Sequence, residues 1–147
     1  MIGLLQRVSS ASIDVDGERI ASIDAGLLVL VGVEQGDSEA QARRLAERLL
    51  NYRVFSDTAG KMNLSLKDTG GALLLVPQFT LAADTRSGNR PGFSTAAEPS
   101  RGKELFDCLV EAAHMQHSGI ETGRFGANMK VSLCNEGPVT LSLRVPP

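Results

Sequence analysis

The polar residues best suited to chemistry lie in one stretch, residues 76–93 (VPQFTLAADTRSGNRPGF). It follows an apolar run at residues 72–76, which predicts a buried strand. Because side chains alternate along a strand, Gln78 and Thr80 are expected on one face, where an amide and a hydroxyl could bind a polar ligand. A basic loop rich in glycine and proline follows, and such loops on a rigid strand often form binding sites. An ordinary strand end and surface loop would show the same pattern.

The sequence contains few residues suited to catalysis by a histidine-based triad, a metal ion or a phosphate-binding loop. Its two histidines are His114 and His117, and no GxSxG motif is present, so a triad built on histidine is not expected. There is no HxxEH or CxxC motif for a metal and no Gly-rich phosphate-binding loop. Thr80 is a plausible side-chain nucleophile, but no base follows or precedes it closely. Catalysis is therefore expected to use hydroxyl, amide, backbone and substrate groups, with no metal and no cofactor.

A second polar stretch lies at residues 135–140 (NEGPVT), between strand-like runs at 131–134 and 140–145. QFTL followed by NxGPxT resembles the D-aminoacyl-tRNA deacylase family. One position departs from the family pattern, because SQFTL is usual and this chain carries Pro77 before QFTL. Further matches run along nearly the whole chain, at residues 1–8, 60–64, 81–85, 123–125 and Met129.

The resemblance implies a homodimeric hydrolase that cleaves the ester between tRNA and a D-amino acid, or glycine, without a cofactor. The catalytic segment would be Gln78, Phe79 and Thr80, whose backbone N–H groups could form an oxyanion hole. One good donor of this kind lowers the barrier by roughly 3–4 kcal/mol. The ester is already activated, and the 2′-hydroxyl of the terminal ribose is a built-in catalytic group. Thr80 is therefore expected to position the substrate, with covalent attack by its hydroxyl as the less favoured alternative.

The resemblance also implies that the Gly137-Pro138 bond is cis and that its carbonyls enter the pocket of the other subunit. The sequence alone favours a trans bond in a simple turn, since only about 5–6% of X-Pro bonds in folded proteins are cis. Carbonyls placed in this way could accept the α-ammonium of the aminoacyl group. An L side chain would then strike the Gly-Pro wall, whereas a D side chain would not. Arg7 would brace this loop from behind; otherwise it is a surface arginine.

Three more residues are expected to contact the end of the tRNA. Pro77 replaces a serine that could contact the terminal adenosine. Phe125 and Met129 could form apolar walls for the adenine or for the motif loop, or they could pack in the core. Phosphate contacts are expected from basic side chains. The candidates are Arg86, Arg90, Arg124 and Lys130.

Two other functions stay open on the sequence. A relative in the same superfamily, acting on L-alanyl-tRNA, carries proline at the place of Pro77 but lacks Phe79, so an editing deacylase for L-alanyl-tRNA is one alternative. Phe79 and the complete NxGPxT favour the D-specific enzyme. A non-catalytic dimer associated with RNA or DNA is the other alternative. The net charge of −2 counts against a general nucleic-acid binder.

The composition is typical of one globular domain over residues 1–147, with 42% hydrophobic and 22% charged residues. No apolar run approaches the ~18 residues of a membrane span, and the residues before Arg7 do not form a signal peptide. Cys108 and Cys134 have no paired or metal-ligand spacing and are expected to be reduced, buried thiols. These features predict a cytoplasmic protein without membrane contact.

Local patterns predict the elements that position these residues. Asp16-Gly17 predicts a hairpin between strands at 4–15 and 19–23. The apolar run at 27–33 predicts a central strand, and residues 53–55 predict a short one.

Two helices are also predicted. Ser38, with Gln41 three residues later, predicts the start of the first, and Pro99 suits the first turn of the second. The polar face of the first helix (Arg43, Arg44, Glu47 and Arg48) is expected to be solvated. The order of elements favours an α+β fold. The resemblance implies a strongly curved, barrel-like, mostly antiparallel sheet with two helices.

Overall fold

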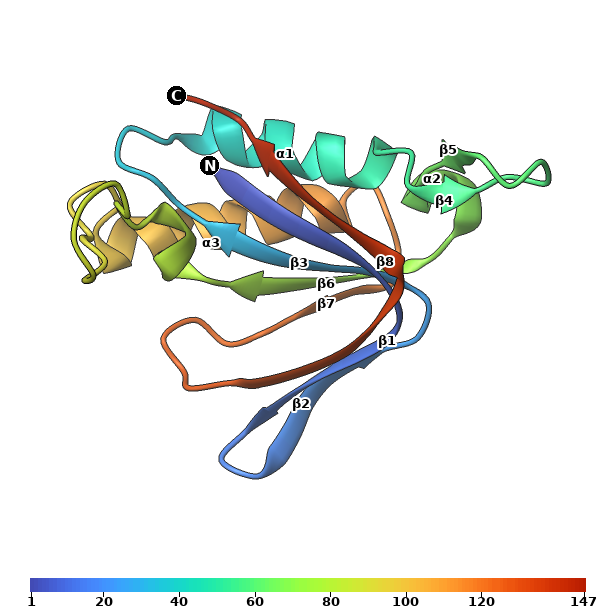
Figure 1. The fold of residues 1–147 in the computed structure, drawn as a ribbon, viewed down its shortest axis with the longest axis horizontal. Coiled ribbons are helices and arrows are strands. Elements are labelled where there is room, and N and C mark those ends of the chain that lie inside the picture. The colour runs from blue at the N-terminus through green and yellow to red at the C-terminus, as the bar shows by residue number, and fades with distance from the viewer.

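The computed structural model describes all 147 residues. One six-stranded sheet curves into a nearly closed barrel (Figure 1). Its strands are β1 (Ile2–Val15), β2 (Glu18–Ile23), β3 (Gly26–Gly32), β6 (Ala72–Pro77), β7 (Ile120–Thr122) and β8 (Lys130–Arg144). The long strand β1 pairs antiparallel with β2, β3 and β8, whereas β3–β6 and β6–β7 are parallel pairs. The predicted α+β fold with a curved, mostly antiparallel sheet is confirmed.

The chain has three α-helices where two were predicted. They are α1 (Glu39–Asn51), the short α2 (Leu66–Thr69) and α3 (Pro99–His114), with a 3-10 turn, η1 (Phe79–Ala82), after β6. The additional helix is a single turn capped by Ser65, whose side chain accepts the Asp68 N–H. A separate two-stranded hairpin consists of β4 (Phe55–Ser56) and β5 (Met62–Leu64). None of the helices combines the length and apolar character needed to cross a membrane.

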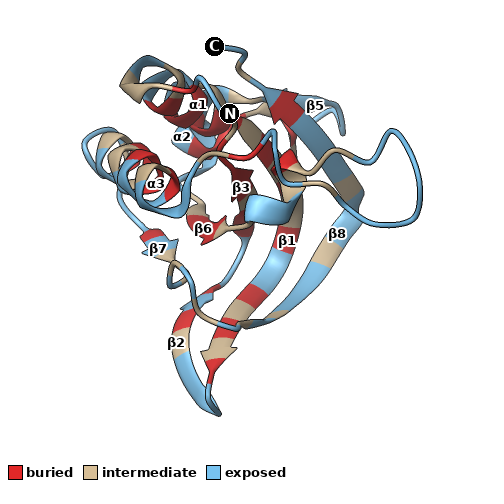
Figure 2. Ribbon diagram, turned by 90° about the vertical axis from the view of Figure 1, so that its left-hand side faces the viewer, coloured by how far each residue is buried: buried red, intermediate tan, exposed pale blue.

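Both faces of the sheet are packed, which explains its continuous apolar strands (Figure 2). Leu27, Val29 and Leu73 face α1 and α3 in the larger core cluster. Leu28 and Leu74, which alternate with them, lie in a smaller cluster enclosed by the curved part of the sheet. The two long helices therefore cover one face, and the sheet covers the other with its own strands.

Several local predictions are confirmed. Asp16 (φ 51°) and Gly17 (φ 79°) form the β1–β2 turn in the left-handed region. The Gln41 side chain accepts the Ser38 N–H at 2.8 Å at the start of α1, and Pro99 is the first residue of α3.

Other predictions are wrong. β6 ends at Pro77, so Gln78 and Thr80 lie in a tight turn and not on a strand face. Residues 135–140 were expected between two strands but lie inside the single strand β8, where residues 136–139 form a turn without partners in β1. The short strand expected at 53–55 is displaced to Phe55–Ser56. Cys108, which packs at the margin of the larger core cluster, is only partly buried, and Cys134 is exposed.

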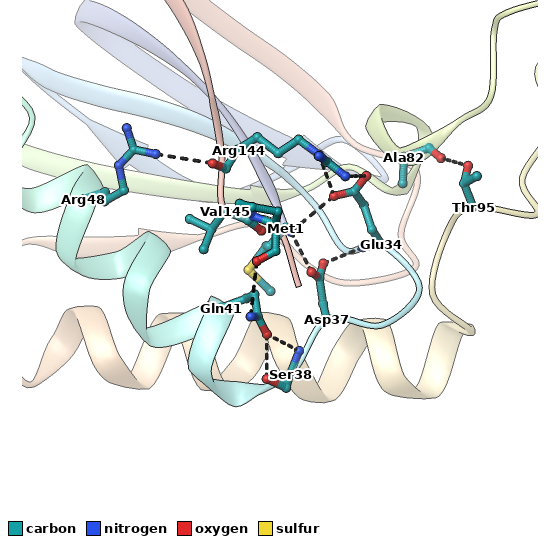
Figure 3. A network of polar contacts seen from close by, with 11 residues as sticks. Met1, Glu34, Asp37, Ser38, Gln41, Arg48, Ala82, Thr95, Arg144 and Val145 are labelled. Carbon is teal, nitrogen blue, oxygen red and sulfur yellow. Dashed lines mark hydrogen bonds and ion pairs between the residues drawn. The ribbon is translucent and has the colours of Figure 1, made fainter.

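The start of the chain is tied into the β3–α1 connection (Figure 3). The Met1 ammonium donates to the Asp37 carboxylate at 2.7 Å and to the Val145 carbonyl at 2.7 Å, and the Asp37 side chain is fully buried. Glu34 adds a longer contact at 3.4 Å and also pairs with Arg144. This network joins β1, the end of β8 and the loop before α1.

Candidate active site

The candidate site is a largely apolar cavity of about 470 Å³ at the carboxyl end of β6, a volume typical of small-molecule sites. It lies between η1, the start of α3 and the segment that leads into β8. Five of the predicted site residues line it, namely Pro77, Gln78, Phe79, Phe125 and Met129. The structure therefore brings together residues that are about 50 positions apart in the chain.

The turn after β6 determines which backbone donors beside the cavity remain free. The Gln78 N–H is used, because it donates to the Val31 carbonyl at 2.8 Å. The N–H groups of Phe79 and Thr80 begin η1 and have no acceptor within the chain. The Gln78 amide nitrogen donates to the Thr80 hydroxyl oxygen. Of the three predicted N–H groups, two are thus free to bind a substrate oxygen.

Glycine allows this turn to lie close to the sheet. A Cβ at Gly32 would approach the Leu81 Cβ to 2.9 Å and the Gln78 carbonyl oxygen to 3.3 Å. Any larger residue at this position of β3 would push η1 away from the sheet, and with it the two free donors. Nothing in the local sequence pattern around Gly32 indicates this contact.

The loop after η1 is closed by its own hydrogen bonds. Asp84 and Gly92 exchange two backbone hydrogen bonds of 2.7 and 3.0 Å. The Arg86 guanidinium binds both Asp84 carboxylate oxygens, at 2.8 and 2.6 Å, and lowers the pKa of Asp84 to about 2. Of the basic residues predicted to contact phosphate, Arg86 is therefore already paired. At the end of the loop the Phe93 ring packs beside the Phe79 ring, with ring centroids 5.1 Å apart, and both rings are exposed.

The far wall of the cavity depends on Gly123, which follows β7. Its N–H donates to the Leu75 carbonyl at 2.9 Å. A Cβ at this position would lie 2.8 Å from the Met129 sulfur and 3.4 Å from the Pro77 ring. Gly123 thus lets Met129 pack beside Pro77, while Phe125 lies against the buried Gly102 of α3. Sequence reasoning noticed GRF at 123–125 but missed this packing role.

Gly137-Pro138 lies elsewhere, within β8. The peptide bond is cis, and both residues are exposed. The Asn135 side chain spans the turn, accepting the Val139 N–H at 2.8 Å and donating to the Thr140 hydroxyl at 2.9 Å. The pairing of β8 with β1 shifts register on both sides of Val8 at this point.

Arg7 holds the same turn from β1. Its Nε donates to the Glu136 carbonyl at 2.9 Å and its Nη1 to the Val54 carbonyl at 2.7 Å. Gly137 itself has a φ of +140°, and a Cβ there would lie 3.1 Å from the Arg7 guanidinium. Neither Gly137 nor Pro138 lines the cavity of its own chain. The QFTL and NxGPxT motifs therefore lie in two separate places on one chain.

No group of three or more His, Cys, Asp or Glu side chains is arranged to hold a metal ion. His117 does not pair with His114, because its Nε2 lies 2.7 Å from the Gly71 carbonyl oxygen.

Residues 4–144 match the model of the family described as D-Tyr-tRNA(Tyr) deacylase. The chain belongs to this family. It is 63% identical over 147 residues to the D-aminoacyl-tRNA deacylase of Thioalkalivibrio sulfidiphilus (strain HL-EbGR7), covering 100% of this chain and 99% of the relative. It is also 63% identical over 145 residues to the D-aminoacyl-tRNA deacylase of Pseudomonas putida (strain GB-1), covering 99% of this chain and 100% of the relative.

Two solved structures share the fold. One, described as "c-Myc DNA Unwinding Element Binding Protein", has a TM-score of 0.95 and 35% identity, with 100% of both chains covered. The other, described as "Structural Analysis of a probable eukaryotic D-amino acid tRNA deacylase", has a TM-score of 0.82 and 16% identity, with 97% of both chains covered. The second likeness concerns the fold alone.

Proposed function

We propose that this protein hydrolyses the ester bond of D-aminoacyl-tRNA, and of glycyl-tRNA, releasing tRNA and the free amino acid. The observation that carries the proposal is the identity of 63% along the full chain with relatives named D-aminoacyl-tRNA deacylase. The free N–H groups of Phe79 and Thr80 at an apolar cavity support it, because ester hydrolysis needs donors where charge develops.

In the proposed mechanism, the ester carbonyl lies against these two N–H groups. Water, assisted by the neighbouring 2′-hydroxyl of the ribose, attacks the carbonyl carbon, and the donors stabilise the negative charge on its oxygen. The bond between the carbonyl carbon and the ribose oxygen then breaks, and that oxygen takes up the proton released by the water. The Thr80 hydroxyl is held by the Gln78 amide and has no base beside it, so its role is to position the substrate.

The chirality filter is assigned to Gly137-Pro138 of a second copy of the chain. In support, this turn is exposed, absent from the cavity of its own chain and fixed by Arg7 and Asn135. Strand β8 is largely exposed (Figure 2), and its exposed residues include the apolar Leu133 and Leu141, as expected for a strand that a second copy covers. The Gly-Pro carbonyls would bind the substrate ammonium and exclude an L side chain.

The residues that line the cavity are proposed to contact the 3′ end of the tRNA. Pro77, Phe125 and Met129 would pack against the terminal adenine, and the exposed Arg90, Arg124 and Lys130 would approach its phosphates. As a homodimer acting on aminoacyl-tRNA, the protein would work in the cytoplasm, where translation takes place.

Two other functions are separated by one assay. The first is editing of L-alanyl-tRNA, which Pro77 suggests. The second is binding of DNA without hydrolysis, which the description of the solved structure at 35% identity suggests. We expect hydrolysis of D-Tyr-tRNA and Gly-tRNA, with L-Tyr-tRNA and L-Ala-tRNA largely intact. Preferential hydrolysis of L-Ala-tRNA would favour the first alternative. Hydrolysis of none of the four, combined with DNA binding, would favour the second.

A further inference from the structure

The polar face of α1 lines a groove. It was expected to be simply solvated, but together with α2 and Gln116 after α3 it lines an open depression of about 740 Å³. We call this depression the α1 groove, and its charged lining consists of Arg43, Arg44, Glu47, Arg48 and Lys67. The groove is separate from the candidate active-site cavity and shares no lining residue with it.

The α1 groove is strongly basic in a chain whose net charge is −2. Its one carboxylate, on Glu47, pairs with Arg44 at 2.7 Å. Arg43, Arg48 and Lys67 form no ion pair within the chain, so three positive charges remain without a carboxylate partner. By contrast, Arg19 and Lys103 on other surfaces each pair with an aspartate.

Neutral neighbours hold two of these cations in the groove. The Arg48 guanidinium lies 5.8 Å from the centre of the Tyr52 ring and donates to the Arg144 carbonyl at 3.4 Å. The Lys67 ammonium donates to the Gln116 side chain at 3.2 Å. These contacts orient the side chains without neutralising them, which leaves charge and N–H donors for an anionic ligand.

The shape and spacing of the α1 groove fit a phosphodiester backbone. Arg43 and Arg48 are five residues apart on a helix, a rise of about 7.5 Å, which is about two steps of the ~3.4 Å rise between neighbouring phosphates on one strand of a duplex. A lipid surface fits less well, because membrane-bound helices present an apolar face, and Tyr52 is the one hydrophobic residue in the lining.

The position of the groove links it to the substrate. Tyr52 lies two residues before Val54, whose carbonyl accepts a hydrogen bond from Arg7, and Arg7 also holds the carbonyl that precedes Gly137. Arg7 therefore connects the segment that follows the α1 groove to the Gly137-Pro138 turn of the same chain. Under the proposed function, this turn lies over the aminoacyl end of the tRNA.

We infer that the α1 groove binds the phosphate backbone of the tRNA acceptor stem, while the terminal adenosine and amino acid occupy the cavity of the second copy, into which the Gly137-Pro138 turn of the first copy reaches. This inference rests on the proposed function for the identity of the RNA. The double variant Arg43→Gln/Lys67→Gln removes two exposed cations and keeps Arg48, which packs on Tyr52. Arg19→Gln/Lys103→Gln is the matched control, because it removes two exposed cations elsewhere.

The first measurement is binding of uncharged tRNA over a range of salt concentrations. The groove variant should bind roughly tenfold more weakly, and its log–log salt slope should be shallower by about 0.7–0.9 for each lost phosphate contact. The control variant should bind like the unmodified protein. An affinity and slope in the groove variant equal to those of the control would overturn the inference.

The second measurement compares hydrolysis of D-Tyr-tRNA with that of D-tyrosyl-adenosine, which has no stem. The groove variant should raise KM for D-Tyr-tRNA and leave hydrolysis of D-tyrosyl-adenosine unchanged; an equal loss on both substrates would overturn the inference. Binding of phosphatidylserine vesicles that is lost in the groove variant, with tRNA binding unchanged, would assign the groove to lipid instead. If tRNA binding follows the expected pattern but no ester is cleaved, the groove assignment stands and the proposed function fails.

Discussion

At the scale of single residues, the candidate site depends on backbone groups more than on side chains. The free donors are the N–H groups of Phe79 and Thr80, whereas the Thr80 hydroxyl contacts the Gln78 amide. The sequence could identify the segment but not this division of roles. The Gln78 N–H is occupied and the next two are free because β6 pairs with β3 as far as Val31, whose carbonyl accepts the hydrogen bond from the Gln78 N–H.

Replacement of Thr80 by alanine tests whether its hydroxyl takes part in covalent catalysis. Thr80→Ala keeps both free N–H groups, so hydrolysis of D-Tyr-tRNA should fall by no more than about tenfold, ~1.4 kcal/mol of barrier. Single-turnover kinetics with saturating enzyme measure this. A loss of several orders of magnitude with unchanged binding would instead point to a covalent intermediate on the Thr80 oxygen.

Replacement of Gly137 by alanine tests the geometry of the β8 turn. A Cβ there would lie 2.8 Å from a Val139 methyl group and 3.0 Å from the Val139 nitrogen, at a φ of +140°. We expect Gly137→Ala to lose most hydrolysis of D-Tyr-tRNA and about 1–3 kcal/mol of stability. Gly17→Ala is the control, because Gly17 also has a positive φ but no atom within 4 Å of its Cβ position. Full activity of Gly137→Ala would show that the turn does not contribute to the site.

At the scale of elements, local sequence patterns predicted where a helix starts and where a hairpin turns, but not which distant strands pair. The hairpin at Asp16-Gly17 and the helix start at Ser38 depend on neighbours within a few residues, and both are confirmed. Strand β8 was predicted as two strands, because its six-residue polar interruption looks like a loop. It is one strand, since β1 pairs with it on both sides of the interruption and Asn135 closes the turn between them.

The loop after η1 gives a prediction on pH. The hydrogen bonds from Arg86 lower the pKa of Asp84 to about 2. The contact therefore contributes its full stabilisation of the loop at pH values above the ordinary carboxyl pKa of about 3.9. This stabilisation is lost as the pH falls through about 2. In Arg86→Gln, the pKa of Asp84 should rise, as followed by the carboxyl carbon shift in an NMR titration. An unchanged pKa in that variant would show that another group lowers it.

The network at the start of β1 predicts a strong effect on stability. Asp37→Asn leaves the Met1 ammonium next to a neutral, fully buried amide. Removing one partner of a buried ion pair costs about 3–5 kcal/mol, which urea unfolding measures. Glu34→Gln should cost clearly less, because Glu34 is partly exposed and lies 3.4 Å from the ammonium. Equal stability of Asp37→Asn and the unmodified protein would contradict the importance of this pair.

At the scale of the whole molecule, the two motifs of one chain lie in separate places. The free donors lie in the turn beside the cavity at the end of β6, and the Gly137-Pro138 turn in β8 lies outside that cavity. The sequence could place both motifs in the chain. It could not show that they lie apart, because that depends on how the sheet curves. Under the proposed function, a complete site would form when a second copy brings its turn to the cavity.

Reconstitution of activity from two inactive variants tests this account most directly. One chain carries Phe79→Pro, which removes a free N–H at the first position of η1, where proline is tolerated. The other carries Gly137→Ala. Each variant alone should hardly hydrolyse D-Tyr-tRNA. Heterodimers, purified with two different affinity tags, should regain about half of the activity of the unmodified dimer, because one of two pockets is then intact. Heterodimers that form but do not hydrolyse D-Tyr-tRNA would contradict a site shared between two chains.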